Sequence, residues 1–183
     1  LGEHADNIGA LSETLPRWIL VLCIAGYERL PQERVEYQGK GVMDIAQSFG
    51  VEPVTALPGA RGSDVLEALS TPSADPYWKL KYKGGCYDIF FLTTLDRTPE
   101  FVTAMYHIAA EAGYPTTDIG IYLQPQMQGR ACHCEFNLTC DPGNATEVER
   151  VRRLFIDASR ALMGMGGFFS RPYGPWAEMA YGR

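Results

Sequence analysis

Strand-like and helix-like segments alternate along this chain, but its last two strand-like segments follow each other directly. Residues 17–27 are almost wholly apolar and predict a buried strand, and residues 87–95 predict a second one. Residues 119–123 and 130–140 predict two further strands, which only a Gln-rich connection separates. Parallel neighbours need a long crossover between them, so this order predicts an antiparallel or mixed sheet.

Apolar stripes at helical spacing, together with residues that begin or end helices, predict the helices. Pro31 begins a helix that runs to about residue 49 and stops at Gly50, and Thr98-Pro99 opens another that runs to residue 112. The remaining segments are a short strand at 51–57, a helix at 63–69 capped by Ser63, and a long helix at 145–163 opened by an Asn144–Glu147 capping pair. Together they predict an α+β fold, ferredoxin-like in style, with helices on one face of the sheet.

Charge and composition exclude several classes of partner. The net charge is −6, whereas binding to phosphate groups needs a basic surface, so we expect no nucleic-acid partner. The longest apolar run is far shorter than a bilayer span, and no secretory signal precedes it, so we expect no membrane partner. The five cysteines are odd in number, which favours a reduced, cytoplasmic protein over a disulfide-linked one.

The strand at residues 130–140 separates into two faces of different chemistry. Its Cys132 side is apolar and predicts core packing, whereas His133, Glu135 and Asn137 form a polar row on the other side. Such a row is either a solvated sheet face or the roof of a substrate pocket. In a pocket, His133 would transfer protons near neutral pH, and Glu135 would hold its tautomer or orient a ligand.

Two other clusters allow a functional and a structural interpretation. Cys132-His133-Cys134 has the residue types of a metal site, but no second cysteine pair accompanies it, so we expect no metal and keep a small metal protein as an alternative. Lys79, Lys81 and Lys83 alternate as on a solvated basic strand edge, which could also contact an acidic partner.

The C-terminal segment is dense in aromatic residues and predicts irregular backbone from residue 164 to residue 183. Residues 168–176 carry Arg171 and Tyr173 among Phe, Pro and Trp, a composition that is costly to expose to solvent. The segment packs either against the domain itself or against a missing domain. Alternatively, it is an anchoring loop in which Arg171 or Tyr173 reaches an anionic or phenolic group.

Three segments resemble the C-terminal half of FAD-linked oxidases of the vanillyl-alcohol oxidase and 4-cresol dehydrogenase type. They are RWILVLCIAGYERL at 17–30, IYLQPQMQGRACHCEFNLTCDP at 121–142 and GGFFSRPYGPWAEMAYGR at 166–183. The resemblance implies that residues 1–183 form a single substrate (cap) domain of a larger flavoprotein. It further implies that FAD is bound mainly by a domain absent from this chain, which is then the chain's partner, and that the chain alone is inactive.

The resemblance also implies an activity: hydride transfer from a small alcohol or phenol to flavin. We expect His133 and Glu135 to be the catalytic residues and Arg171, Tyr173 and Asn137 to bind the small-molecule substrate. The family's adjacent Tyr-Arg pair is absent, and Arg171-Pro172-Tyr173 supplies the same residue types at another spacing. Homo-oligomers remain possible, and the alternative is a stand-alone ferredoxin-like binding or regulatory domain without catalytic activity.

Overall fold

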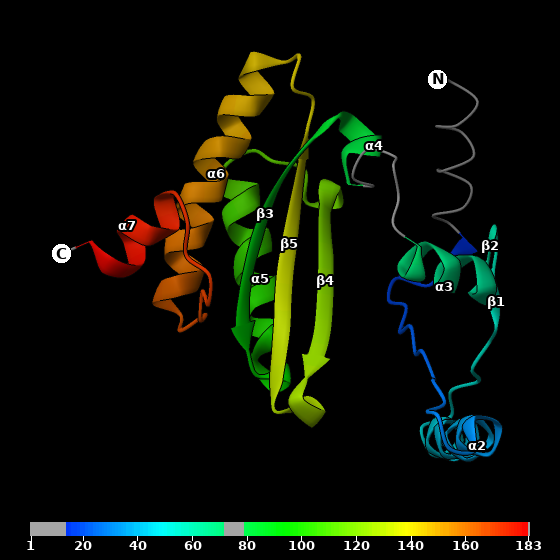
Figure 1. The fold of residues 1–183 in the computed structure, drawn as a ribbon. Helices are drawn as coiled ribbons and strands as arrows, with labels where there is room; N and C mark the ends of the chain where they lie inside the picture. Colours follow the sequence, from blue (N-terminus) through cyan, green and yellow to red (C-terminus); the bar gives the residue numbers. More distant parts are fainter. Residues whose placement is uncertain (1–13, 72–78, 183) are drawn as a thin grey trace. The chain divides into compact units, whose positions relative to one another are not determined.

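The computed structural model describes residues 14–71 and 79–182 of the chain (Figure 1). The chain divides into two compact units, Leu1–Ala74 and Asp75–Arg183, which we call the N-terminal and C-terminal units. Each unit is described by itself. None of the described helices is long and apolar enough to cross a membrane.

The C-terminal unit is built on a three-stranded antiparallel sheet. Its strands are β3 (Gly85–Thr93), β4 (Ile119–Gln126) and β5 (Ala131–Cys140), and β5 lies in the centre of the order β3-β5-β4. Helices α5 (Thr98–Glu111) and α6 (Ala145–Gly164) pack against each other on one face of this sheet (Figure 1). Of the predicted antiparallel or mixed sheet with helices on one face, the antiparallel arrangement is the one found in this unit.

Local signals explain where these elements begin and end. The side chain of Asn144 accepts a hydrogen bond from the Glu147 backbone N–H at 3.2 Å, as expected of the residue that caps α6. Pro99 lies in the first turn of α5, and Gly113 follows the helix with a φ of 66°, which a residue with a side chain rarely adopts. Three-residue 3₁₀ turns at Leu95–Arg97, Thr116–Asp118 and Met127–Gly129 complete the connections.

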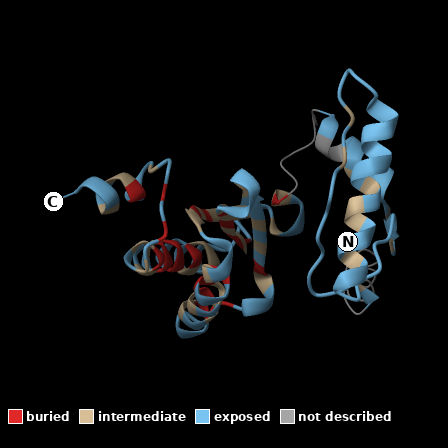
Figure 2. Cartoon of the chain, turned by 90° about the horizontal axis from the view of Figure 1, so that it is seen from below, coloured by how far each residue is buried: buried red, intermediate tan, exposed pale blue. Residues whose placement is uncertain are grey.

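The core lies between the sheet and these two helices. Its largest fully buried side chains come from β3, β5, α5, α6 and the C-terminal segment: Trp176, Phe91, Phe101, Phe136, Ile89, Met105, Leu138, Leu154 and Leu162. Every buried residue that the structure describes belongs to the C-terminal unit, as the red positions in Figure 2 show.

The C-terminal segment is more regular than predicted. A short helix, α7 (Pro175–Tyr181), follows a single bridge between Leu92 and Phe168 at the edge of β3. Trp176 is fully buried: its indole N–H donates to Ser159 Oγ at 2.8 Å, and its ring stacks on Phe155 with centroids 5.4 Å apart. A helix of seven residues is too short to be stable by itself, so α7 depends on these contacts with α6.

A second short helix replaces the predicted loop and basic strand edge near residue 80. Helix α4 (Leu80–Lys83) precedes β3, and it ends at Gly84, whose φ is 91°. The lysines that alternate in the sequence thus lie at the start of a helix and along it. The part of the predicted loop at residues 72–78 lies outside the described residues.

The N-terminal unit holds α2 (Pro31–Ser48), α3 (Gly62–Ser70) and a two-stranded ribbon of β1 (Ala56–Leu57) and β2 (Ala60–Arg61). The prediction for α2 is confirmed. The predicted strand at 51–57 is reduced to its last two residues. The cap of α3 was wrongly assigned to Ser63: Arg61 occupies that position, and its backbone N–H donates to Asp64.

The predicted buried strand at residues 17–27 is wrong for the described structure. These residues pair with no other strand among the described residues, and Leu20 is 77% exposed. An extended segment becomes a strand only when a neighbour accepts its backbone hydrogen bonds. The apolar composition of this segment indicated that its side chains prefer a buried place. Among the described residues, however, no strand pairs with it.

Candidate functional site

The candidate site lies on the face of the sheet that α5 and α6 do not cover. We call it the polar sheet face and define it by seven residues: Asp88, Phe90, Tyr122, Gln124, His133, Glu135 and Asn137. The register places Asp88 opposite Asn137 and Phe90 opposite Glu135 on one side of β5, and Tyr122 opposite Glu135 on the other. The cysteines and Phe136 of β5 are buried on the helix side. The predicted separation of β5 into two faces is therefore confirmed.

A buried lysine organises the charges on this face. Lys79 is only 6% exposed, and its ammonium forms ion pairs with Glu135 Oε1 and, at 3.1 Å, with Asp88 Oδ2. The amide nitrogen of Asn137 donates to both carboxylates, to Asp88 Oδ1 and to Glu135 Oε1, each at 2.7 Å. Gly120 lies opposite Asn137, and a Cβ there would come within 3.1 Å of the amide oxygen, so glycine leaves room for this side chain.

Lys79 was missed as a site residue, and its predicted place on a solvated edge is wrong. It lies 56 residues from Glu135 in the sequence, so no local pattern connects them. Alternation of lysines is common on exposed surfaces, and only the fold reveals that one of the three is covered. One signal was available in the sequence. The strands that hold Asp88 and Glu135 carry no lysine or arginine on the same face, so a cation from elsewhere in the chain was to be expected beside them.

His133 is held between a carboxylate and two aromatic rings. Its Nε2 lies 3.0 Å from Glu135 Oε2. Its ring stacks on the Phe90 ring with centroids 5.9 Å apart, and it meets the Tyr122 ring edge-on with centroids 6.0 Å apart. Burial works to raise the pKa of Glu135, but hydrogen bonds from Lys79, Asn137 and His133 outweigh it and leave that pKa below its ordinary value. An ionised carboxylate only accepts hydrogen bonds, so Nε2 is the ring nitrogen that carries a proton toward Glu135.

The C-terminal segment brings the remaining predicted residues to Phe90. The guanidinium carbon of Arg171 lies 5.6 Å from the Phe90 ring centroid, and the Tyr173 ring lies 6.4 Å from it. Tyr173 is 57% exposed, and burial followed by the nearby charge of Asp88 raises the pKa of its phenol. The structure thus joins His133, Glu135 and Asn137 by direct hydrogen bonds, whereas Arg171 and Tyr173 approach them only through Phe90.

The cysteines and His133 of β5 point to opposite faces of the sheet. Cys132 and Cys134 are fully buried on the helix side, and burial raises the pKa of Cys134 to about 12, which keeps its thiol protonated. His133 faces away from them, so the three side chains do not converge on one ion. Within residues 14–71 and 79–182, no three His, Cys, Asp or Glu side chains are grouped as metal ligands.

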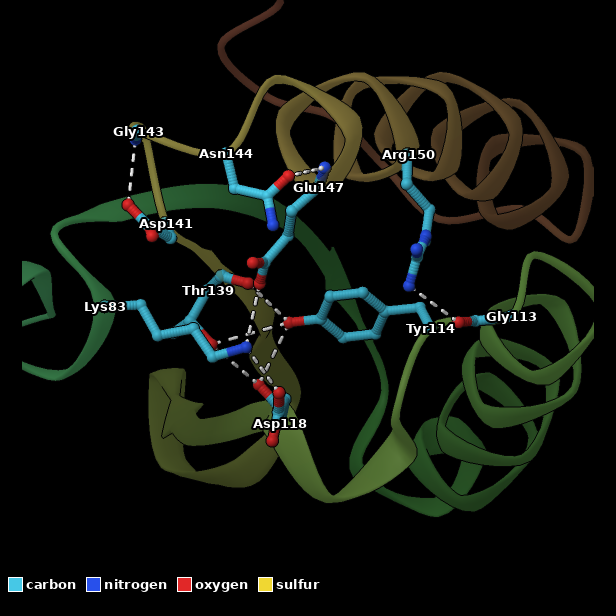
Figure 3. A network of polar contacts seen from close by, with 10 residues as sticks. All are labelled: Lys83, Gly113, Tyr114, Asp118, Thr139, Asp141, Gly143, Asn144, Glu147 and Arg150. Atoms are coloured by element: carbon cyan, nitrogen blue, oxygen red, sulfur yellow. Dashed lines mark hydrogen bonds and ion pairs between the residues drawn. The ribbon is translucent and has the colours of Figure 1, made fainter. Parts of the chain in front are cut away.

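A second lysine cluster lies at the end of the sheet and is structural. Lys83 Nζ contacts Asp118 Oδ2 at 2.7 Å and Glu147 Oε1 at 2.8 Å (Figure 3). These hydrogen bonds raise the pKa of Lys83 well above its ordinary value. Beside it, the Tyr114 hydroxyl donates to the Thr139 carbonyl at 2.9 Å (Figure 3). Lys83 therefore connects α4, the start of β4 and the first turn of α6.

Comparison of the chain with family models, with curated proteins and with solved structures found no match.

Proposed function

We propose that this chain is the substrate-binding (cap) domain of an FAD-dependent oxidoreductase that removes a hydride from a small alcohol or phenol-type substrate. The observation that carries the proposal is the pair of His133 Nε2 and Glu135 Oε2, with the imidazole ring in contact with Phe90 and Tyr122. In a neutral imidazole held this way, Nδ1 is the proton acceptor. The sequence resemblance to FAD-linked oxidases, which points to the same face, supports it.

The residues of the face fit a substrate better than they fit the phosphates of a dinucleotide. The buried cation Lys79 is already neutralised by two carboxylates, and the surroundings of His133 are aromatic. FAD, bound mainly by another domain, would supply the hydride acceptor. His133 Nδ1 takes the hydroxyl proton, Glu135 holds the imidazole in place, and Asn137 holds Glu135.

Arg171 and Tyr173 are proposed to bind the part of the substrate that does not react. Both are exposed and lie close to the Phe90 ring, and their polar groups are suited to a phenol or an anionic oxygen. A substrate seated on Phe90 would then have its hydroxyl-bearing end toward His133. This arrangement explains why the aromatic C-terminal segment packs back onto the sheet edge.

The topology of the C-terminal unit supports the ferredoxin-like part of the proposal. The elements β3, α5, β4, β5 and α6 follow the order of the first five elements of a β-α-β-β-α-β fold. In that fold, the sixth element pairs beside the first strand, and the Leu92–Phe168 bridge lies at that edge of β3. The five free cysteines are in keeping with a reducing, cytoplasmic location, which we also propose.

A stand-alone binding or regulatory domain is the second candidate. It is favoured by the self-sufficient core of the C-terminal unit, in which α7 completes the packing through Trp176. Such a domain needs neither a flavin nor a proton acceptor.

His133→Ala in the native flavoprotein tests the proposed role of His133. With benzyl alcohol as the probe substrate, we expect turnover to fall by about 100-fold or more, the range lost with a general base, while the flavin absorption stays unchanged. His107→Ala, on the exposed face of α5, is the matched control. Turnover equal to wild type in His133→Ala would remove His133 from the mechanism.

A further inference from the structure

Lys79 is the only charged residue that is buried among the residues that the structure describes. A buried charge without partners strongly destabilises a fold, so a lysine here has to be explained by what it contacts. Two of its partners, Asp88 and Glu135, lie diagonally on adjacent strands, because Asp88 is opposite Asn137, two residues from Glu135. Lys79 therefore separates two carboxylates that the sheet forces together.

Glu135 divides its two oxygens between different partners. Oε1 accepts from Lys79 and from Asn137, and Oε2 accepts from His133 Nε2 at 3.0 Å. Glu135 thus connects Lys79 to the imidazole. Through it, Lys79 can act on His133 by fixing the charge and the orientation of this carboxylate.

Loss of the ammonium would change the state of that carboxylate. Asp88 and Glu135 would then share only the amide of Asn137, and two carboxylates so close together favour a proton on one of them. A protonated Glu135 donates as well as accepts. His133 Nε2 could then accept from it and release its own proton to Nδ1.

We propose that Lys79 is a positioning residue that acts through Glu135 to keep His133 in the Nε2–H tautomer, with Nδ1 free to accept a proton. That Nδ1 accepts a proton from the substrate rests on the proposed function. Which tautomer His133 adopts is a property of this chain alone and can be measured without a substrate. A lysine far away in sequence thereby decides which imidazole nitrogen carries the proton.

The test is the imidazole ¹⁵N spectrum of the full chain at neutral pH, where the chain's three histidines give few signals. Wild type and Lys79→Arg should show the Nε2–H tautomer at His133. Lys79→Met should shift a third or more of the population to Nδ1–H. Lys81→Met, at an exposed position of α4, is the matched control and should match wild type.

Two results would overturn the proposal: an Nδ1–H tautomer in wild type, or an unchanged Nε2–H tautomer in folded Lys79→Met. If Lys79→Met does not fold, Glu135→Gln replaces it, and retention of pure Nε2–H there overturns the proposal equally. Activity is a separate readout. If the tautomer shifts as expected but neither Lys79→Met nor His133→Ala alters turnover, the proposed function fails and the positioning role of Lys79 stands.

Discussion

The two units of this chain contain similar kinds of segments but differ in what covers them. In the C-terminal unit, the apolar faces of β3, β5, α5 and α6 meet each other, and Trp176 is fully buried. In the described part of the N-terminal unit, no side chain is buried, and Trp18 is 55% exposed. The difference teaches that an apolar segment acquires a defined place only when the same structure supplies its partner.

The largest difference in stability should appear between substitutions of Trp176 in the C-terminal unit and Trp18 in the N-terminal unit. Trp176→Ala removes a fully buried ring and its hydrogen bond to Ser159, so the free energy of unfolding should fall by about 3–5 kcal/mol. Trp18→Ala removes an exposed ring and should change it by less than about 0.5 kcal/mol. Urea unfolding followed by circular dichroism measures both. Equal losses would mean that the N-terminal unit has a core of its own.

A smaller, pH-dependent effect should appear at Glu135. Its pKa lies below the ordinary 4.5 in the folded chain, so its ionised form stabilises the fold above about that pH, and this contribution is lost as the pH falls through the lower, folded value. Glu135→Gln should therefore be less stable than wild type at neutral pH, by about 1–3 kcal/mol, and the gap should narrow below pH 4.5.

Glu111→Gln supplies the control for this pH series. The Glu111 side chain is 69% exposed on α5. The free energy of unfolding of Glu111→Gln should therefore equal that of wild type at every pH. A gap between wild type and Glu135→Gln that stays constant into acid would show that Glu135 is not the charged partner of Lys79.

The smallest effect on stability should come from a substitution in the segment at residues 17–27. The same substitution should measurably lower the binding of an apolar dye to the surface. Leu20→Asn at a 77% exposed position should leave the free energy of unfolding within about 0.5 kcal/mol of wild type. The native chain should bind an apolar fluorescent dye, and this variant should bind less of it. A native chain that binds no dye would show that these apolar side chains are covered.

The parts of the fold that were predictable have local causes. Asn144 marks the start of α6 through its own hydrogen bond, and alternation along β5 assigned His133 and Cys134 to opposite faces before any partner strand was known. The capping signal and the two-residue period are both written within a few residues of sequence.

The parts that were missed depend on contacts between distant residues. Lys79 joins the site across 56 residues, and α7 is held by the contact of Trp176 with α6. The prediction for residues 17–27 was wrong for the opposite reason. Their apolar composition predicted a buried strand, but no described strand pairs with them. Sequence alone predicted His133, Glu135 and Asn137 as neighbours, but it could not supply the cation that holds them.

The central claim is that this chain is one part of a flavoprotein, and the native polypeptide in its source cells tests it most directly. The measurement is its intact mass, together with the visible absorption spectrum of the same purified material. We predict a mass well above the 20.3 kDa of this chain and a flavin spectrum. A native chain of this mass without visible absorption would contradict the account and leave the stand-alone binding domain in its place.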